Sequence, residues 1–253
     1  MKSPNVLLVC VDHWPASFLG CAGHDWIQTP TLDQLAANGI RFPNTYSATP
    51  ICLPARRTLM TGLTTRSHSP GTRENAGGPM PPVPTLAQCF RDAGYQAYAV
   101  GKLHVQPQRQ RIGFDDVLLE EEGRMYAGGD QDDYDIYLTE HGYVGRRFTH
   151  GMCNNTYVSR PWHLPEQYHV TNWAAQQMSR VVQRRDPRCR RRLYKVTWRR
   201  DRGRATGCGV YYPIPAQACA ADRCVFPLGA FLCMRPRVSR PKTGRGWSGS
   251  VAT

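Results

Sequence analysis

Cys52 lies in the string "CLPARR", in which a cysteine, a proline and an arginine occupy every second position, and "LMTG" follows closely. Pro50 and Pro54 flank the cysteine, and proline costs no hydrogen bond in the first turn of a helix. The run "PARRTLMTG" therefore predicts a short helix that ends at Gly62. Free N–H groups and the positive dipole end at the start of such a helix stabilise an anion. Cys52 is thus a candidate nucleophile for sulfate or phosphate chemistry, and the alternative is a cysteine that only packs before the helix.

Three further residues with useful chemistry follow two predicted strands. The apolar run "NVLLVCV" predicts a strand that is buried on both faces of a parallel sheet, and Asp12 comes directly after it. The run "YQAYAV" predicts another strand, and Lys102 and His104 lie just past its end. Ligands of open α/β sheets bind beyond the carboxyl ends of the strands. We therefore expect Asp12, Lys102 and His104 at one edge of the sheet.

Predicted helices separate these strands, which indicates an α/β fold with a mostly parallel sheet flanked by helices. The expected helix N-caps are Thr31, Thr85 and Thr171. Gly39 and Gly94 are the expected ends of the first two helices. Residues 40–42 form a possible short strand. The helix after Thr171 carries an apolar face, which we expect in the core, made of Ala174, Met178, Val181 and Val182.

Two polar segments were considered as sites. The string "DQDDYDIY" lacks the glycine and the distal glutamate of a calcium-binding loop, so we expect a solvated acidic loop. Its acidic residues are Asp130, Asp132, Asp133 and Asp135. His163 and His169 flank "LPEQY", and we expect them on the surface, with a substrate-facing role as the alternative.

The net charge of +13 is confined to one end of the chain. Residues 1–186 contain 17 Lys and Arg and 17 Asp and Glu, whereas residues 187–253 contain 15 and 2. This predicts a boundary, with a catalytic part at 1–186 and a disordered basic tail, rich in Arg, Cys, Gly and Pro, at 187–253. We expect the tail to follow a frameshift or junction near Pro187. A basic arm that binds nucleic acid and a small separate domain are the alternatives.

The expected location is the cytoplasm. The apolar run at 6–11 is too short for the core of a signal peptide, and no stretch approaches the length of a membrane span. The first five cysteines are too far apart for a paired metal motif, which fits a reducing compartment. We expect no membrane partner and no nucleic-acid partner.

Five segments, taken in order, resemble the N-terminal half of type I sulfatases, which belong to the alkaline-phosphatase-like superfamily. They are "PNVLLVCVDHW", "TPTLDQLAANGIRFPNTYS", "CLPARRTLMTG", "PTLAQCFRDAGYQAYAVGKLH" and "GFDD", and the resemblance covers about residues 4–186. It implies an alkaline-phosphatase-like α/β fold, incomplete at the C-terminus, and hydrolysis of a small-molecule sulfate ester to alcohol and sulfate. A phosphonate monoester or phosphodiester hydrolase of the same superfamily is the alternative. A non-catalytic remnant whose basic tail binds nucleic acid is another.

The resemblance also implies roles for individual residues. Cys52 would be converted to formylglycine by a formylglycine-generating enzyme, and Arg56 would support it. The hydrated aldehyde would attack sulfur through one oxygen and expel sulfate with the other. A divalent cation, most often Ca²⁺ in this family, would take Asp12 and the modified Cys52 as ligands. Lys102 would hold the sulfate oxygens, and His104 would orient the diol or the sulfate.

The sequence departs from the family pattern in two respects. His13 stands where many relatives have a second aspartate. The later metal motif, the leaving-group histidine and the second lysine of the family are not found after residue 186. Since a calcium ion prefers six to eight oxygen ligands, we expect the 253-residue chain to be weakly active or inactive.

Overall fold

The computed structural model of the chain describes residues 4–12, 14–68, 78–122, 131–152, 160–186, 188–189 and 191–199, and the backbone of strands at 223–225 and 231–234. His13 and Asp130 lie outside the described residues. No helix among the described residues is long and apolar enough to cross a membrane.

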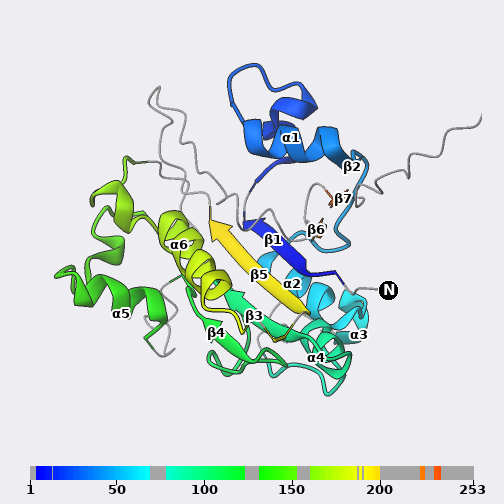
Figure 1. Cartoon of the computed structure of the whole chain (residues 1–253). Helices are drawn as coiled ribbons and strands as arrows, with labels where there is room; N and C mark the ends of the chain where they lie inside the picture. Colours follow the sequence, from blue (N-terminus) through cyan, green and yellow to red (C-terminus); the bar gives the residue numbers. More distant parts are fainter. Residues whose placement is uncertain are drawn as a thin grey trace, which may run out of the picture.

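A parallel sheet forms the centre of the described structure (Figure 1). Its strands are β1 (Val6–Asp12), β3 (Gln96–Val100), β4 (Asp116–Leu118), β5 (Arg192–Arg199) and β6 (Arg223–Val225). They lie in the order β4-β3-β5-β1-β6, and every neighbouring pair is parallel. The predicted α/β class and the first two strands are confirmed. All five carboxyl ends therefore lie at one edge of the sheet.

Helices cover both faces of this sheet (Figure 1). On one face, α6 (Val170–Gln183) buries Trp173, Ala174 and Met178 against β3 and β5. On the other, α2 (Cys52–Thr61) and α4 (Leu86–Asp92) contribute Met60 and Ala87 to a second apolar cluster. The remaining α-helices are α1 (Pro30–Asn38), α3 (Thr65–His68) and α5 (Asp133–Glu140). Strand β2 (Gly39–Phe42) pairs antiparallel with β7 (Phe231–Met234).

Strand β5 lies beyond residue 186, within the segment that we expect, from its excess of positive charge, to be a disordered tail. It occupies the middle of the sheet between β3 and β1, with Leu193, Tyr194 and Val196 buried. Strands β6 and β7 also come from this segment. The described sheet therefore continues past the expected boundary at residue 186, and residues 192–199 form a strand within the segment that was expected to be disordered.

Two of the three expected helix caps were wrong. Helix α1 begins at Pro30 after Thr29, because proline has the backbone angle of a first helical residue, so Thr31 lies inside the helix. Helix α6 is capped by His169, whose Nδ1 accepts the N–H of Thr171 at 3.2 Å. Thr85 does cap α4, where its hydroxyl oxygen accepts the N–H of Gln88 at 3.2 Å.

The acidic segment is not a solvated loop. Asp132 is 1% exposed, and its carboxylate caps α5 by accepting the N–H of Asp135 at 2.9 Å. The buried guanidinium of Arg147 pairs with Asp132 at 2.8 Å, with Asp135 at 3.0 Å and also with Glu120. Burial and the neighbouring Asp132 raise the pKa of Asp135 to about 6, although Arg147 opposes the shift. Two of the acids therefore share one arginine at the start of α5.

The raised pKa of Asp135 predicts a pH dependence of stability. The folded carboxyl binds its proton more tightly than the unfolded one, whose pKa has the ordinary value of 3.8, so its contribution to stability falls as pH rises from about 4 to about 6. The Asp135→Asn variant removes this titration. We expect the unfolding free energy of the native chain, relative to Asp135→Asn, to decrease across this window in urea titrations. A relative increase with pH would contradict the assignment.

Gly101, the residue after β3, lies against β5. Its N–H donates to the carbonyl of Leu118 at 2.8 Å, and its φ is +90°. A Cβ atom at this position would lie 2.4 Å from the carbonyl oxygen of Thr197. The close approach of the chain after β3 to β5 thus requires a glycine.

Gly101→Ala should destabilise the fold by more than the cost of placing an alanine in the left-handed conformation. A left-handed alanine costs about 1–2 kcal/mol, and the clash with Thr197 adds about 1–3 kcal/mol. Gly142→Ala is the matched control, because Gly142 has φ +82° and open space around its Cβ position. Denaturant unfolding should show the larger loss for Gly101→Ala, and equal losses would exclude the steric contribution.

Candidate functional site

The predicted helix after Cys52 is confirmed. Cys52 is the first residue of α2, Ile51 precedes it in extended conformation, and Gly62 ends the helix with φ +69° while its N–H donates to the Thr58 carbonyl at 2.8 Å. The thiol is partly exposed, and its Sγ lies 4.0 Å from Oδ1 of Asp12. The helix start and the end of β1 therefore bring the two predicted residues together.

Asp12 joins two buried cations at this point. Its Oδ1 lies 3.4 Å from Nη2 of Arg56, and its Oδ2 lies 3.0 Å from Nζ of Lys102. These three side chains come from β1, α2 and the chain after β3. Parallel strands end at a common edge, and α2 points its first turn at the same edge. Four of the five predicted site residues, Asp12, Cys52, Arg56 and Lys102, are thus in one cluster.

The main-chain carbonyl of Lys102 accepts donors from two other elements. Nη1 of Arg56 donates to it at 2.7 Å, Nζ of Lys195 at 3.1 Å and Oγ1 of Thr197 at 3.2 Å. Lys195 lies on β5 and is completely buried, and this burial lowers its pKa to about 8. Side chains from the central strand β5 and from α2 therefore hold the turn after β3 through this carbonyl.

An acidic stretch that sequence reasoning missed completes the cluster. It begins two residues after the end of β4 and consists of Glu120, Glu121 and Glu122. Oε1 of Glu121 accepts the N–H groups of Leu103 and His104, each at 2.8 Å. Oε2 of Glu122 lies 2.7 Å from Nζ of Lys102. The signal in the sequence is three acids in a row at the end of a strand, at the edge where ligands gather.

The charges in this cluster support one another. Burial alone would lower the pKa of Lys102, but Glu122 and Asp12 outweigh it, so the pKa lies above its ordinary value. Burial would likewise lower the pKa of Arg56, but the negative charges of Asp12, Glu122 and Glu121 raise it, and the pKa lies above its ordinary value. Lys102 and Arg56 are therefore cations at neutral pH.

The predicted histidines differ in their settings. His104 has a left-handed backbone with φ 61°, and its N–H is held by Glu121. The predicted role of its imidazole stays a prediction. His163 and His169 are partly buried rather than on the open surface. Nε2 of His163 lies 2.6 Å from the carbonyl of Arg146, and His169 caps α6.

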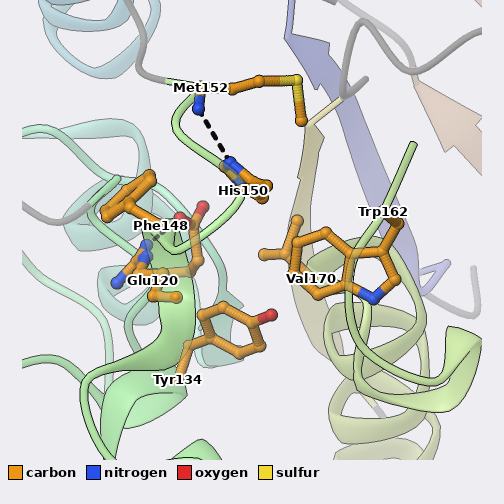
Figure 2. A pocket seen from close by; sticks show the side chains of 8 residues that line it. Glu120, Tyr134, Phe148, His150, Met152, Trp162 and Val170 are labelled. Carbon is orange, nitrogen blue, oxygen red and sulfur yellow. Dashed lines mark hydrogen bonds and ion pairs between the residues drawn. The ribbon is translucent and has the colours of Figure 1, made fainter. Parts of the chain in front are cut away.

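A narrow aromatic pocket lies near the cluster, between the start of α6 and the segment after β4. Figure 2 shows Tyr134 and Phe148 on one side and Trp162 and Val170 on the other. Its wall also contains Glu120, the neighbour of the glutamates that hold the Lys102 turn. The acidic stretch after β4 thus contributes to the pocket and to the cluster.

Comparison with known proteins agrees with this arrangement. The family model for the sulfatases matches residues 4–191. The chain belongs to the sulfatase family. It is 34% identical over 195 residues to an arylsulfatase of Clostridium perfringens, and this match covers 73% of the chain and 40% of the relative. It is 37% identical over 130 residues to human N-acetylgalactosamine-6-sulfatase, covering 46% and 25% of the two chains. The sulfatase chain therefore spans less than half of the length of these relatives.

Solved structures share the fold of this chain. A phosphonate monoester hydrolase of Agrobacterium radiobacter has a TM-score of 0.57 at 22% identity, covering 78% of this chain and 41% of its own. A protein in complex with its substrate D-glucosamine-2-N,6-O-disulfate has a TM-score of 0.54 at 20% identity, covering 81% and 35%. Both confirm the alkaline-phosphatase-like fold.

Sulfatases generally use a formylglycine and a divalent metal ion, and in this chain Asp12 is the predicted metal ligand beside Cys52. The carboxylate of Asp12 lies 4.0 Å from Sγ of Cys52, and both of its oxygens face cationic side chains. Among the described residues, no group of three or more His, Cys, Asp or Glu side chains could hold a metal ion. The described residues therefore do not fit a complete divalent cation site.

Asp12→Asn should destabilise the fold, because it leaves two buried cations with less negative charge. Removing one partner of a buried ion pair costs about 3–5 kcal/mol, and since Glu122 still pairs with Lys102 we expect the lower end. Asp116→Asn is the control, since Asp116 pairs with Arg111 on the surface, where such pairs contribute about 0–1 kcal/mol. If the two variants lower the unfolding free energy in urea by the same amount, Asp12 does not stabilise the two buried cations.

Proposed function

We propose that this chain carries the nucleophile and the anion-binding side chains of a sulfuric ester hydrolase. One observation supports the proposal most strongly. Cys52, at the start of a helix, lies beside Asp12, and the buried cations Arg56 and Lys102 contact the same carboxylate. A nucleophile next to two fixed positive charges suits an ester that develops negative charge as its bond to sulfur breaks.

Each residue of the cluster has a proposed task. A formylglycine made from Cys52 by a formylglycine-generating enzyme would supply the hydrated aldehyde that attacks sulfur. Arg56 fixes the start of α2 to the Lys102 turn and keeps positive charge beside the nucleophile. Lys102 would hold the sulfate oxygens, and His104 would orient the nucleophile or the sulfate. Asp12 would be one ligand of a divalent cation, for which we propose Ca²⁺, with further ligands from outside the described residues.

The substrate class follows from the family. The relatives named above are an arylsulfatase and an N-acetylgalactosamine-6-sulfatase, so we propose a small-molecule sulfate ester as substrate. The cytoplasmic location and the frameshift near Pro187 stay predictions.

Activity and modification test the proposal together. We expect the chain, coexpressed with a formylglycine-generating enzyme, to show the mass of the aldehyde in the Cys52 peptide and weak hydrolysis of an aryl sulfate. Cys52→Ala is the matched control and should abolish both signals. Hydrolysis that persists in Cys52→Ala, or a preference for the matching aryl phosphodiester, would argue against a sulfatase.

A further inference from the structure

The ammonium group of Lys102 is enclosed by two carboxylates. It lies 3.0 Å from Oδ2 of Asp12 and 2.7 Å from Oε2 of Glu122, and the side chain is 2% exposed. Charge-assisted hydrogen bonds of this length are among the strongest in proteins. A sulfate oxygen that is to reach this ammonium therefore competes with an internal anion.

We propose that Glu122 is an internal counter-anion that occupies Lys102 when no substrate is bound and thereby sets the affinity of the site for sulfate. This inference rests on the proposed function, because it takes Lys102 as the sulfate-binding group. When sulfate enters, Asp12 stays paired with Arg56, whereas the carboxylate of Glu122 moves away from Nζ of Lys102. Glu122 is thus a residue that determines affinity without touching the reacting atoms.

The charge balance of the cluster favours this role. Its cations are Arg56, Lys102 and Lys195, and its carboxylates are Asp12, Glu121 and Glu122. The two sets are equal in number, so these six side chains together carry no net charge when no metal ion is bound. Withdrawal of the Glu122 carboxylate, or its replacement by a neutral amide, leaves one excess positive charge at the position of Lys102.

The backbone indicates that Glu122 is held in place by its surroundings. Its φ is 56°, a left-handed conformation that residues other than glycine rarely adopt, and His104 has the same conformation with φ 61°. Glu121 lies between the two, because its carboxylate holds the N–H of His104, and Glu120 accepts the N–H of Glu122 at 3.0 Å. Strained residues of this kind gather at ligand sites, and here both adjoin Lys102.

Binding of inorganic sulfate to the whole chain tests this inference without any need for turnover. Isothermal titration calorimetry at neutral pH, low salt and in the presence of EDTA compares the native chain with Glu122→Gln. Removing one negative charge at this short distance should tighten sulfate binding about tenfold or more. Glu140→Gln removes the same charge from an exposed position on α5 and should leave the affinity unchanged. Lys102→Met should abolish binding in both backgrounds.

The outcomes separate this inference from the proposed function. Equal sulfate affinity in the native chain and in Glu122→Gln, with binding lost in Lys102→Met, would overturn the role of Glu122 and leave the sulfate site in place. Sulfate binding that does not depend on Lys102, or no binding in any variant, would count against both. If Glu122→Gln lacks the native far-UV circular dichroism spectrum, Glu122→Asp replaces it. That variant withdraws the carboxylate from Nζ, and we expect about threefold tighter binding.

Discussion

The carboxylate of Asp12 is the interaction on which this site depends. It is the point where β1, α2 and the turn after β3 meet, since Arg56 and Lys102 both contact it and Cys52 lies beside it. Two buried cations in one place repel each other and lose their hydration, so an anion that contacts both stabilises the pair. The position of the nucleophile therefore follows from the need to neutralise these charges.

The sheet makes this arrangement possible because its strands are parallel. Residues that follow β1, β3 and β4 meet at one edge although more than 100 positions separate Asp12 from Glu122. Gly101 lets the turn after β3 pass close to the carbonyl of Thr197 on β5. Lys195 and Arg56 then hold the carbonyl of Lys102. The turn is thus fixed through its backbone carbonyl. The side chain of Lys102 can therefore pair with the carboxylates of Asp12 and Glu122.

Local patterns in the sequence predicted β1, β3, α2 and four members of the cluster, because strand ends and helix starts are local features. The apolar run before Asp12 and the prolines around Cys52 each carry their own signal. The role of Glu121 could not be predicted in this way, since its partners Leu103 and His104 are distant in sequence. Asp132 was misread for the same reason, because its burial depends on Arg147, fifteen residues later. Charge counting failed at β5, whose inward Lys195 resembles a surface residue by type.

The buried Lys195 shows why composition misled at this strand. A lysine inside a parallel sheet is expensive, and the lowering of its pKa to about 8 expresses that cost. The cost is reduced because Nζ of Lys195 donates to the Lys102 carbonyl at 3.1 Å and to the Thr197 hydroxyl at 2.8 Å, and because the negative charges of Glu121 and Asp12 oppose the effect of burial. The buried lysine of β5 is therefore stabilised in its central position by neutral acceptors and by an acidic edge. That edge is formed by the end of β1 and the stretch after β4, so the strand and the site depend on the same balance of charge.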